Sequence, residues 1–180
     1  YENKEFNINE PFEGLFTQGM VCHETYKDKK GNWLSPEQVF FENGNFYYEE
    51  DNKKDIVKIG PSESMSKSKK NTIDPENIIS NYGADAVRLF ILSDSPPEKD
   101  IQWSESGIIS AYKFVQKLWT LHLKIKKKIE EKNSFKNQEN ISKFTNIFIN
   151  KITNNLERFR YNVIIANLYE MYNFLNKEID

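Results

Sequence analysis

The residues best suited to chemistry form a short run at residues 64–71, with the sequence SMSKSKKN. Lys67 carries an ammonium group, a mobile point charge, between the hydroxyl groups of Ser66 and Ser68. Ammonium, hydroxyl and backbone N–H groups together suit a polyphosphate, because each can donate a hydrogen bond to a phosphate oxygen. Taken alone, such a run is also typical of a solvated loop or a linker. The choice between the two interpretations therefore depends on the elements predicted around this run.

The composition limits the class of protein. A chain of 180 residues can form one domain or two small ones. Its hydrophobic content of 38% and aromatic content of 14% can supply hydrophobic cores, which excludes a wholly disordered chain. The formal net charge of −2 argues against a general polyanion-binding protein. Any contact with nucleic acid must therefore come from local patches of positive charge.

Cysteine and histidine give no sign of a metal site or a disulfide. Cys22 is the only cysteine in the sequence, and we expect an ordinary strand thiol. His23 and His122 complete no cluster with metal-ligand spacing, so we expect no bound metal, and His122 is expected to be a packed or edge histidine. No apolar run reaches the length of a membrane span, and residues 1–5 lack the apolar stretch of a signal peptide, which favours a cytoplasmic protein.

The segment before the serine-lysine run predicts β-structure. Residues 15–22 are apolar on both alternating faces, as in a strand of a sheet that is covered on both sides. Asn43-Gly44 is a hairpin signal between two aromatic-rich runs, and residues 51–54 form a further turn before a strand at 55–59. Residues 23–62 therefore predict a small antiparallel meander. Six aromatics are expected as its core, with a nucleic-acid stacking platform as the second interpretation: Trp33, Phe40, Phe41, Phe46, Tyr47 and Tyr48.

The segment after the run predicts helices. Asp74-Pro75 combines a side-chain cap with proline at the first helical position, and Gly83 is expected as a left-handed cap at the end of that helix. A second short helix over 84–92 should be buried along Val87, Phe90 and Ile91. Three longer amphipathic helices are predicted over about 105–132, 141–156 and 161–179, with a polar connection at 134–140. Short links predict an antiparallel bundle. The expected buried stripe of the first of these helices is Ile108, Tyr112, Val115, Trp119 and His122.

Residues 64–71 resemble the KMSKS signature loop of class I aminoacyl-tRNA synthetases, with Ser64 in place of the first lysine. Further stretches resemble bacterial leucyl-tRNA synthetases in the same order. They are EPF at 10–12 with TQGMV at 17–21, YGAD at 82–85 with VRLF at 87–90, PPE at 96–98 with Trp103, and RYN at 160–162. The YGAD motif also occurs in valyl and isoleucyl enzymes. The PPE segment, Trp103 and the β-rich insertion before the loop favour the leucyl family.

The resemblance implies an α+β, mostly α, fold in four parts. Residues 1–22 would end a Rossmann-type catalytic domain, and 23–62 would be a β-rich leucine-specific insertion. Residues 63–103 would hold the KMSKS-type loop and stem-contact helices, and 104–180 an incomplete α-helical anticodon-binding bundle. Nothing in the chain resembles the HIGH signature or the editing insertion, so we expect a fragment that is inactive by itself.

The resemblance also implies a reaction and a set of contacts. The complete enzyme would activate leucine with ATP and Mg²⁺ to leucyl-adenylate and transfer leucine to tRNA(Leu), as a cytoplasmic monomer. Lys67 would stabilise the departing pyrophosphate, and Met65 would anchor the loop by packing. The fragment would not bind ATP stably. The expected ATP-contacting residues are Ser64, Met65, Ser66, Lys67 and Ser68; the tRNA-contact candidates are Lys69, Arg158, Arg160 and Asn162.

Several alternatives remain open at this level. The chain could belong to a valyl or isoleucyl synthetase, to a non-catalytic tRNA-binding module, or to a regulatory protein that binds protein partners. Asp85 and Arg88 predict a local ion pair, with a tRNA-facing Arg88 as the alternative. A set of lysines on the long helix could be solvated or could form a basic ridge that contacts tRNA phosphates: Lys113, Lys117, Lys124, Lys127 and Lys128.

Overall fold

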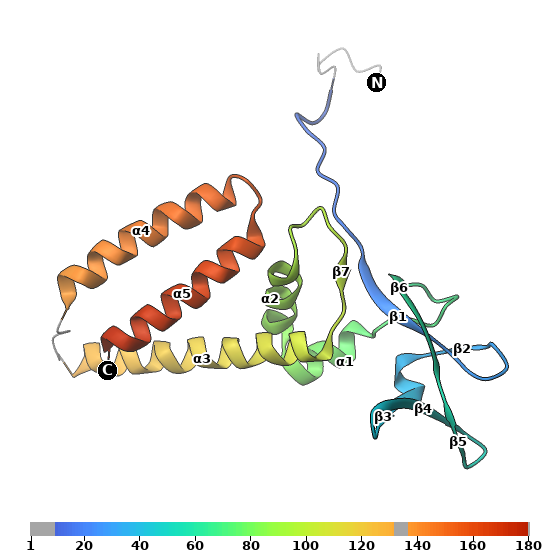
Figure 1. Cartoon of the computed structure of the whole chain (residues 1–180). Coiled ribbons are helices and arrows are strands. Elements are labelled where there is room, and N and C mark those ends of the chain that lie inside the picture. Colours follow the sequence, from blue (N-terminus) through green and yellow to red (C-terminus); the bar gives the residue numbers. More distant parts are fainter. Residues whose placement is uncertain (1–9, 132–136, 180) are drawn as a thin grey trace.

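The computed structural model describes residues 10–131 and 137–179. Residues 1–9 of the segment expected to end a Rossmann-type domain (1–22) lie outside this described part. Residues 134–136 of the expected polar connection (134–140) also lie outside it. The described chain is a mixed α/β structure, about half of it helical. The strands gather at one end and three long helices at the other, with two short helices between them (Figure 1).

A four-stranded sheet is built around β1 (Val21–Lys27). One edge of β1 pairs along its whole length with antiparallel β6 (Lys58–Ser64). The other edge pairs with antiparallel β2 (Trp33–Leu34) at one end and with parallel β7 (Ile101–Gln102) at the other. The start of β1 therefore lies between the last residues of β6 and the segment that leads into the long helices.

The strand expected over 15–22 is wrong in position, because the strand begins only at Val21. Residues 10–20 run as an extended segment outside the sheet, and Leu15 is 90% exposed. The segment is held by the loop after α2 instead of by a partner strand. The Gly19 N–H donates to the Pro97 carbonyl at 2.9 Å, and the Met20 N–H donates to the Asp100 carboxylate at 2.8 Å.

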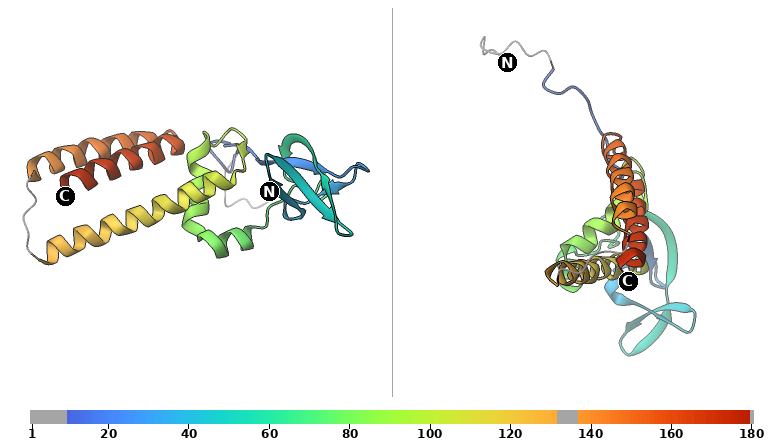
Figure 2. Two further views of the ribbon diagram at one scale, coloured as in Figure 1. Left: turned by 60° about the horizontal axis from the view of Figure 1, so that its bottom comes forward. Right: turned by 90° about the vertical axis from the view of Figure 1, so that its left-hand side faces the viewer.

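The meander predicted over 23–62 is confirmed only in its middle part, as a separate three-stranded antiparallel sheet, because its two ends belong to β1 and β6 of the first sheet. It contains β3 (Val39–Glu42), β4 (Asn45–Glu50) and β5 (Lys53–Ile56), after a 3-10 turn at Pro36–Gln38. Asn43 and Gly44 have positive φ angles of 49° and 83°, as a two-residue hairpin turn requires. This sheet is inserted between β1 and β6, at the end of these strands far from the serine-lysine run (Figure 2).

The core of the insertion differs from the expected aromatic set. Its buried residues are Tyr26, Leu34, Tyr48 and Val57, with Val39 and Phe46 packed against them. Phe41 is 64% exposed and Phe40 is 39% exposed, so the prediction is wrong for these two. The two side chains point to opposite faces of β3, which is an edge strand with β4 as its one partner in the sheet, so each ring has a neighbouring strand on one side only.

Two short helices connect the sheet to the long helices: α1 (Pro75–Tyr82) and α2 (Ala84–Asp94). The predicted cap is confirmed, since the Asp74 carboxylate accepts the Glu76 N–H at 2.9 Å. Gly83 has a φ of 80°, but its ψ of 153° is outside the left-handed helical region. The expected cap conformation is therefore wrong, because Gly83 ends α1 and begins α2 at the same time and the chain must change direction there.

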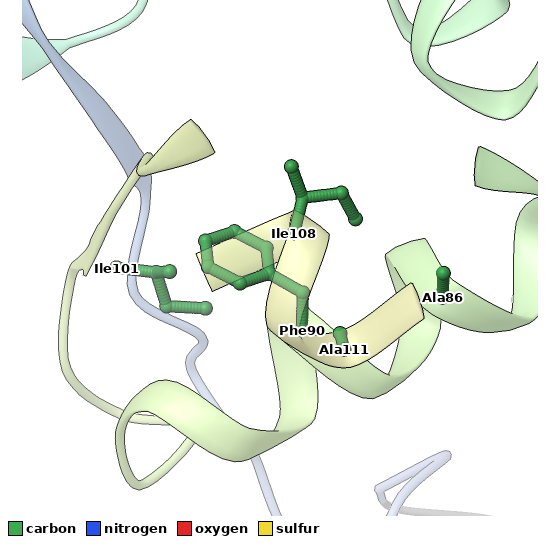
Figure 3. Close-up of a cluster of buried hydrophobic side chains, with 5 residues drawn as sticks. All are labelled: Ala86, Phe90, Ile101, Ile108 and Ala111. Atoms are coloured by element: carbon green, nitrogen blue, oxygen red, sulfur yellow. The ribbon is translucent and has the colours of Figure 1, made fainter. Parts of the chain in front are cut away.

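The junction between the two ends of the molecule has its own hydrophobic core. Its buried residues come from α2, from β7 and from the first turns of the next helix: Ala86, Phe90, Ile101, Ile108 and Ala111. Figure 3 shows the Phe90 ring beside Ile101 and Ile108. Phe90 also meets Trp103 edge to face, with ring centroids 5.3 Å apart. This core fixes α2 against the start of the next helix, and the burial that the sequence predicted for Phe90 is confirmed.

Three long helices complete the chain: α3 (Glu105–Glu130), α4 (Gln138–Leu156) and α5 (Tyr161–Ile179). The helices α4 and α5 run antiparallel, and α5 also packs on α2 and α3 (Figure 2). The expected stripe of α3 is partly wrong. Trp119 is 61% exposed, whereas Phe114 is 2% exposed and stacks on Tyr169 with a centroid distance of 3.6 Å.

Candidate functional site

The serine-lysine loop, residues 64–71, connects the end of β6 to the start of α1. The Met65 N–H donates to the Val21 carbonyl at 3.2 Å, so pairing with the start of β1 continues one residue past β6. The Lys70 N–H donates to the Lys67 carbonyl at 3.3 Å, and Lys70 has a positive φ of 54°. The four residues 67–70 therefore form a tight turn that projects from the sheet.

Asn71 fixes the base of this turn. Its side chain is only 1% exposed, and its Oδ1 accepts the Ser66 N–H at 2.8 Å. Its Nδ2 donates to the carbonyls of His23 and Glu63, at 3.2 Å each. Both ends of the loop are thereby joined to β1 and β6. Sequence reasoning missed the role of this residue, because two of its partners are backbone carbonyls of β1 and β6, which leave no signal in the sequence.

The structure brings three of the predicted residues together in the turn. The hydroxyl oxygens of Ser66 and Ser68 lie 3.2 Å apart, on either side of Lys67 in the chain. The Lys69 N–H donates to the Ser66 hydroxyl at 3.4 Å. Lys67 itself is exposed and makes no ion pair with any residue that the structure describes. A free ammonium at the tip of a turn with a fixed base can reach an anion in solution.

The other predicted loop residues have different surroundings. Met65 is half-buried. Ser64 is exposed, and its hydroxyl lies 4.0 Å from the Cys22 sulfur, whose burial in β1 confirms the expected strand thiol. The Lys69 ammonium forms an ion pair with the Glu63 carboxylate. This ion pair is a second connection between β6 and the turn. Because of it, the Glu63 carboxylate partly compensates the charge of Lys69.

The candidates for RNA contact lie on a separate element, the turn between α4 and α5. Arg158 and Arg160 are exposed there, and Asn162 is half-buried in the first turn of α5. The Arg160 N–H donates to the Asn155 carbonyl at 2.9 Å, which fixes the turn. The ring of Phe159 lies 5.0 Å from that of Phe16, so this turn is adjacent to the extended N-terminal segment. The structure does not place these residues on the serine-lysine loop.

The remaining charged candidates are partly paired within the chain. Asp85 and Arg88 form the predicted ion pair at 3.0 Å, but both side chains are well exposed, so the pair adds little stability. Lys127 pairs with Glu131, and the Lys128 ammonium donates to the Ile179 carbonyl. Two lysines of the expected basic ridge therefore have partners inside the chain.

A cavity of about 420 Å³ lies beside the sheet, between β1, the insertion and the start of α3. Tyr26 lines it, and its hydroxyl donates to the Glu24 carboxylate at 3.2 Å. Burial, and then the neighbouring Glu24 charge, raise the pKa of Tyr26 to about 12. This tyrosine is therefore protonated at neutral pH and acts as a hydrogen-bond donor.

Within residues 10–131 and 137–179, no three acidic, histidine or cysteine side chains gather in a way that could hold a metal ion. In the same part of the chain, no helix is both long enough and apolar enough to cross a membrane. The donor groups of the serine-lysine loop are therefore the most distinctive chemical feature that the described residues offer.

Comparison with known proteins also points to the serine-lysine loop. The family model of class I tRNA synthetases (I, L, M and V) matches residues 48–104, which include the loop, α1 and α2. Leucine–tRNA ligase of Rickettsia bellii (strain RML369-C) is 44% identical over 179 residues, which are 99% of this chain and 21% of the relative. The chain is homologous to one fifth of a leucine–tRNA ligase. The resemblance stated from the sequence is thereby confirmed.

Other leucine–tRNA ligases support the same relationship. The ligase of Zymomonas mobilis subsp. mobilis is 42% identical over 171 residues, which cover 95% of this chain and 20% of the relative. Among solved structures, the chain resembles the LeuRS of Agrobacterium radiobacter K84 in a ternary complex with tRNA and LeuAMS. The TM-score is 0.57 at 26% identity, over 64% of this chain and 16% of that one. The chain thus spans about a fifth of the length of the curated relatives it matches.

Proposed function

We propose that this chain is the part of a leucine–tRNA ligase that carries its ATP-contacting loop. The observation that carries the proposal is the Lys67 ammonium, which forms no ion pair with the described residues and lies on a turn with a fixed base, in a chain that is 44% identical to a leucine–tRNA ligase along 99% of its length. The complete enzyme would join leucine to tRNA(Leu) in two steps. Leucyl-adenylate would form first, and its leucyl group would then pass to a terminal ribose hydroxyl of the tRNA.

The first step explains why the loop consists of donors. A carboxylate oxygen of leucine attacks the α-phosphorus of ATP, a new oxygen–phosphorus bond forms, and the bond to the bridging oxygen of pyrophosphate breaks. Negative charge grows on the departing pyrophosphate, so donors that are already in place lower the barrier. Lys67 would supply the charge, and the hydroxyls of Ser66 and Ser68, 3.2 Å apart, would supply hydrogen bonds.

The loop offers N–H, O–H and ammonium donors, which fit phosphate oxygens. It offers no cluster of carboxylates among the described residues, and Mg²⁺ prefers oxygen ligands. Mg²⁺ that accompanies ATP would accordingly be held by the phosphates and by other parts of the complete enzyme. Closing of the loop over bound ATP would exclude water and place Lys67 at the departing group.

The remaining parts of the chain fit supporting roles. Residues 1–22 would end the Rossmann-type catalytic domain, 23–62 would form the leucine-specific insertion, 63–103 the loop and stem-contact helices, and 104–180 part of an anticodon-binding bundle. Support comes from the three-stranded sheet inserted between β1 and β6 and from the antiparallel pair α4 and α5.

Contact with tRNA(Leu) would come from exposed cations away from the loop. Arg158 and Arg160 are exposed on the turn between α4 and α5, next to Asn162, and can reach a phosphate backbone. Lys69 is a weaker candidate, because its ammonium pairs with Glu63. Ser64 would contact ATP only through its hydroxyl, since it lacks the charge of the signature lysine.

Leucine-dependent exchange of pyrophosphate into ATP by the complete ligase tests this proposal. We expect exchange with leucine to exceed exchange with valine or isoleucine by at least about 100-fold, the discrimination typical of a side-chain pocket. Equal or faster exchange with valine or isoleucine would overturn the leucine assignment. The isolated 180-residue chain should form no leucyl-tRNA.

A further inference from the structure

Asn71 is a buried polar side chain directly next to an exposed, cationic turn. It is 1% exposed, whereas Lys67 and Lys70 in the turn are exposed. Its carboxamide binds the backbone on both sides: the oxygen accepts the Ser66 N–H at 2.8 Å, and the NH₂ group donates to the carbonyls of His23 and Glu63. Asn71 therefore does not face solvent and cannot itself contact ATP.

These contacts require a primary amide. One side of the group must accept from an N–H while the other donates to two carbonyl oxygens, and only Asn and Gln carry an acceptor oxygen and an NH₂ group with two donors on one planar group. A carboxylate would place negative charge against the two carbonyl oxygens, and an alkyl group would leave buried backbone groups unpaired. The longer Gln side chain would not fit a site closed to solvent on all sides.

The amide joins three points that determine where Lys67 lies. His23 belongs to β1, Glu63 to β6, and Ser66 is the residue before Lys67. The Lys69–Glu63 ion pair closes the same turn from outside, but both of its side chains are more than one-third exposed, so the pair contributes little. The buried amide is thus the principal connection between the turn and the sheet.

We propose that Asn71 is a positioning residue whose carboxamide holds the backbone of Lys67 at the place where its ammonium meets the departing pyrophosphate. This role rests on the proposed function of the loop. It predicts that loss of the amide slows leucine activation without affecting the binding of leucine, because Asn71 touches only the loop and the sheet.

The test is Asn71→Asp in the complete ligase, measured by leucine-dependent pyrophosphate exchange between pH 6 and pH 8. At pH 8 the ionised carboxylate cannot donate, and we expect kcat to fall by about 30-fold, within the range that a misplaced catalytic group produces. The KM for leucine should stay within about two-fold. Burial and the facing carbonyls raise the pKa of a carboxyl group at this position.

Recovery at low pH distinguishes positioning from general damage. A protonated carboxyl group can accept the Ser66 N–H with one oxygen and donate with the other to one of the two carbonyls, so it restores two of these three hydrogen bonds. We therefore expect Asn71→Asp to regain most of its kcat relative to the parent as the pH falls to 6. The neighbouring titratable groups are His23, Glu63 and Lys69, and they are present in every variant. Dividing each variant by the parent at the same pH removes the pH dependence that the parent itself has.

Two comparison variants complete the design. Asn52→Asp makes the same chemical change at an exposed turn residue, so its exchange should match the parent at every pH. Asn71→Ser keeps a group that both donates and accepts but is shorter; we expect an intermediate loss with no dependence on pH. Asn71→Ser also tests the positioning role if Asn71→Asp does not fold at pH 8. In the 180-residue chain, the protection factor of the Ser66 amide, which is corrected for the intrinsic pH dependence of hydrogen exchange, should be lower in Asn71→Asp than in the parent at pH 8 and should approach the parent's value at pH 6.

The outcomes separate this inference from the proposed function. Exchange by Asn71→Asp and Asn71→Ser at the parent's rate overturns the positioning role, and so does a loss for Asn71→Asp that is equal at pH 6 and pH 8. If Lys67→Ala retains full exchange, the proposed function of the loop is wrong, whatever Asn71 does. If Lys67→Ala is slow while both Asn71 variants are fast, only the positioning role is wrong.

Discussion

The Nδ2 atom of Asn71 lies 3.2 Å from the carbonyl oxygen of His23, although the two residues are 48 positions apart in the sequence. The chain between them leaves β1 at Lys27 and enters β6 at Lys58, and these two residues are paired at the far end of β1 and β6. The loop lies at the opposite end, where Cys22 pairs with Ser64. The loop and the insertion therefore lie at opposite ends of the paired strands β1 and β6.

The packing of α3 against α5 can be tested by removing the ring of Phe114, which α3 buries against α5. Phe114→Ala should lower the free energy of unfolding by about 3–5 kcal/mol, because Phe114 is 2% exposed and stacks on Tyr169. Urea unfolding of the chain, followed by helical circular dichroism, measures this. The matched control is Trp119→Ala on the same helix; its ring is 61% exposed, so the change should stay within about 0.5 kcal/mol. A larger loss for Trp119→Ala than for Phe114→Ala would contradict the described face of α3.

The sheet end has a pH-dependent stability that involves Tyr26. Its pKa is raised from 10.0 to about 12, so the folded state favours the protonated hydroxyl. The resulting stability is fully present below pH 10 and is lost as the pH rises towards 12. The difference in unfolding free energy between the parent and Tyr26→Phe should therefore shrink between pH 10 and pH 12. Tyr169, whose pKa burial also raises, is common to both proteins and cancels. A constant difference across this interval would show that the Tyr26 hydroxyl is not held in its protonated form.

The arginines between α4 and α5 can be tested by the salt dependence of tRNA binding. Each phosphate contact that is lost should reduce the slope of log affinity against log salt by about 1. Arg158→Ala and Arg160→Ala in the complete ligase should each weaken tRNA(Leu) binding and flatten this slope. Arg88→Ala is the comparison, because Arg88 pairs with Asp85 on α2 and should leave the slope unchanged. An unaltered slope for both Arg158→Ala and Arg160→Ala would exclude their contact with phosphate.

Features that depend on neighbouring residues could be predicted from the sequence. The Asn43-Gly44 hairpin formed because both residues tolerate the positive φ that the turn needs. Asp74 caps α1 because its side chain reaches an N–H two residues away. The serine-lysine loop was predicted on the same local basis, since its donors lie side by side in the chain.

Features that depend on distant backbone could not be predicted. Which row of α3 is buried depends on where α5 crosses it, and this favoured Phe114 over Trp119. The partners of Asn71 are carbonyl groups of β1 and β6, which every residue carries and which therefore leave no signal in the sequence. The strand expected at 15–22 failed for a similar reason, because apolar alternation does not reveal whether a partner strand is present.

The central claim is that the Lys67 ammonium stabilises the departing pyrophosphate. Leucine-dependent pyrophosphate exchange by Lys67→Ala in the complete ligase tests it most directly. The control is Lys70→Asn, which removes the other exposed lysine of the turn with a residue that accepts its positive φ of 54°. We predict a loss of about 100-fold or more for Lys67→Ala and a change of no more than about three-fold for Lys70→Asn. Exchange by Lys67→Ala within a few-fold of the parent would contradict the account.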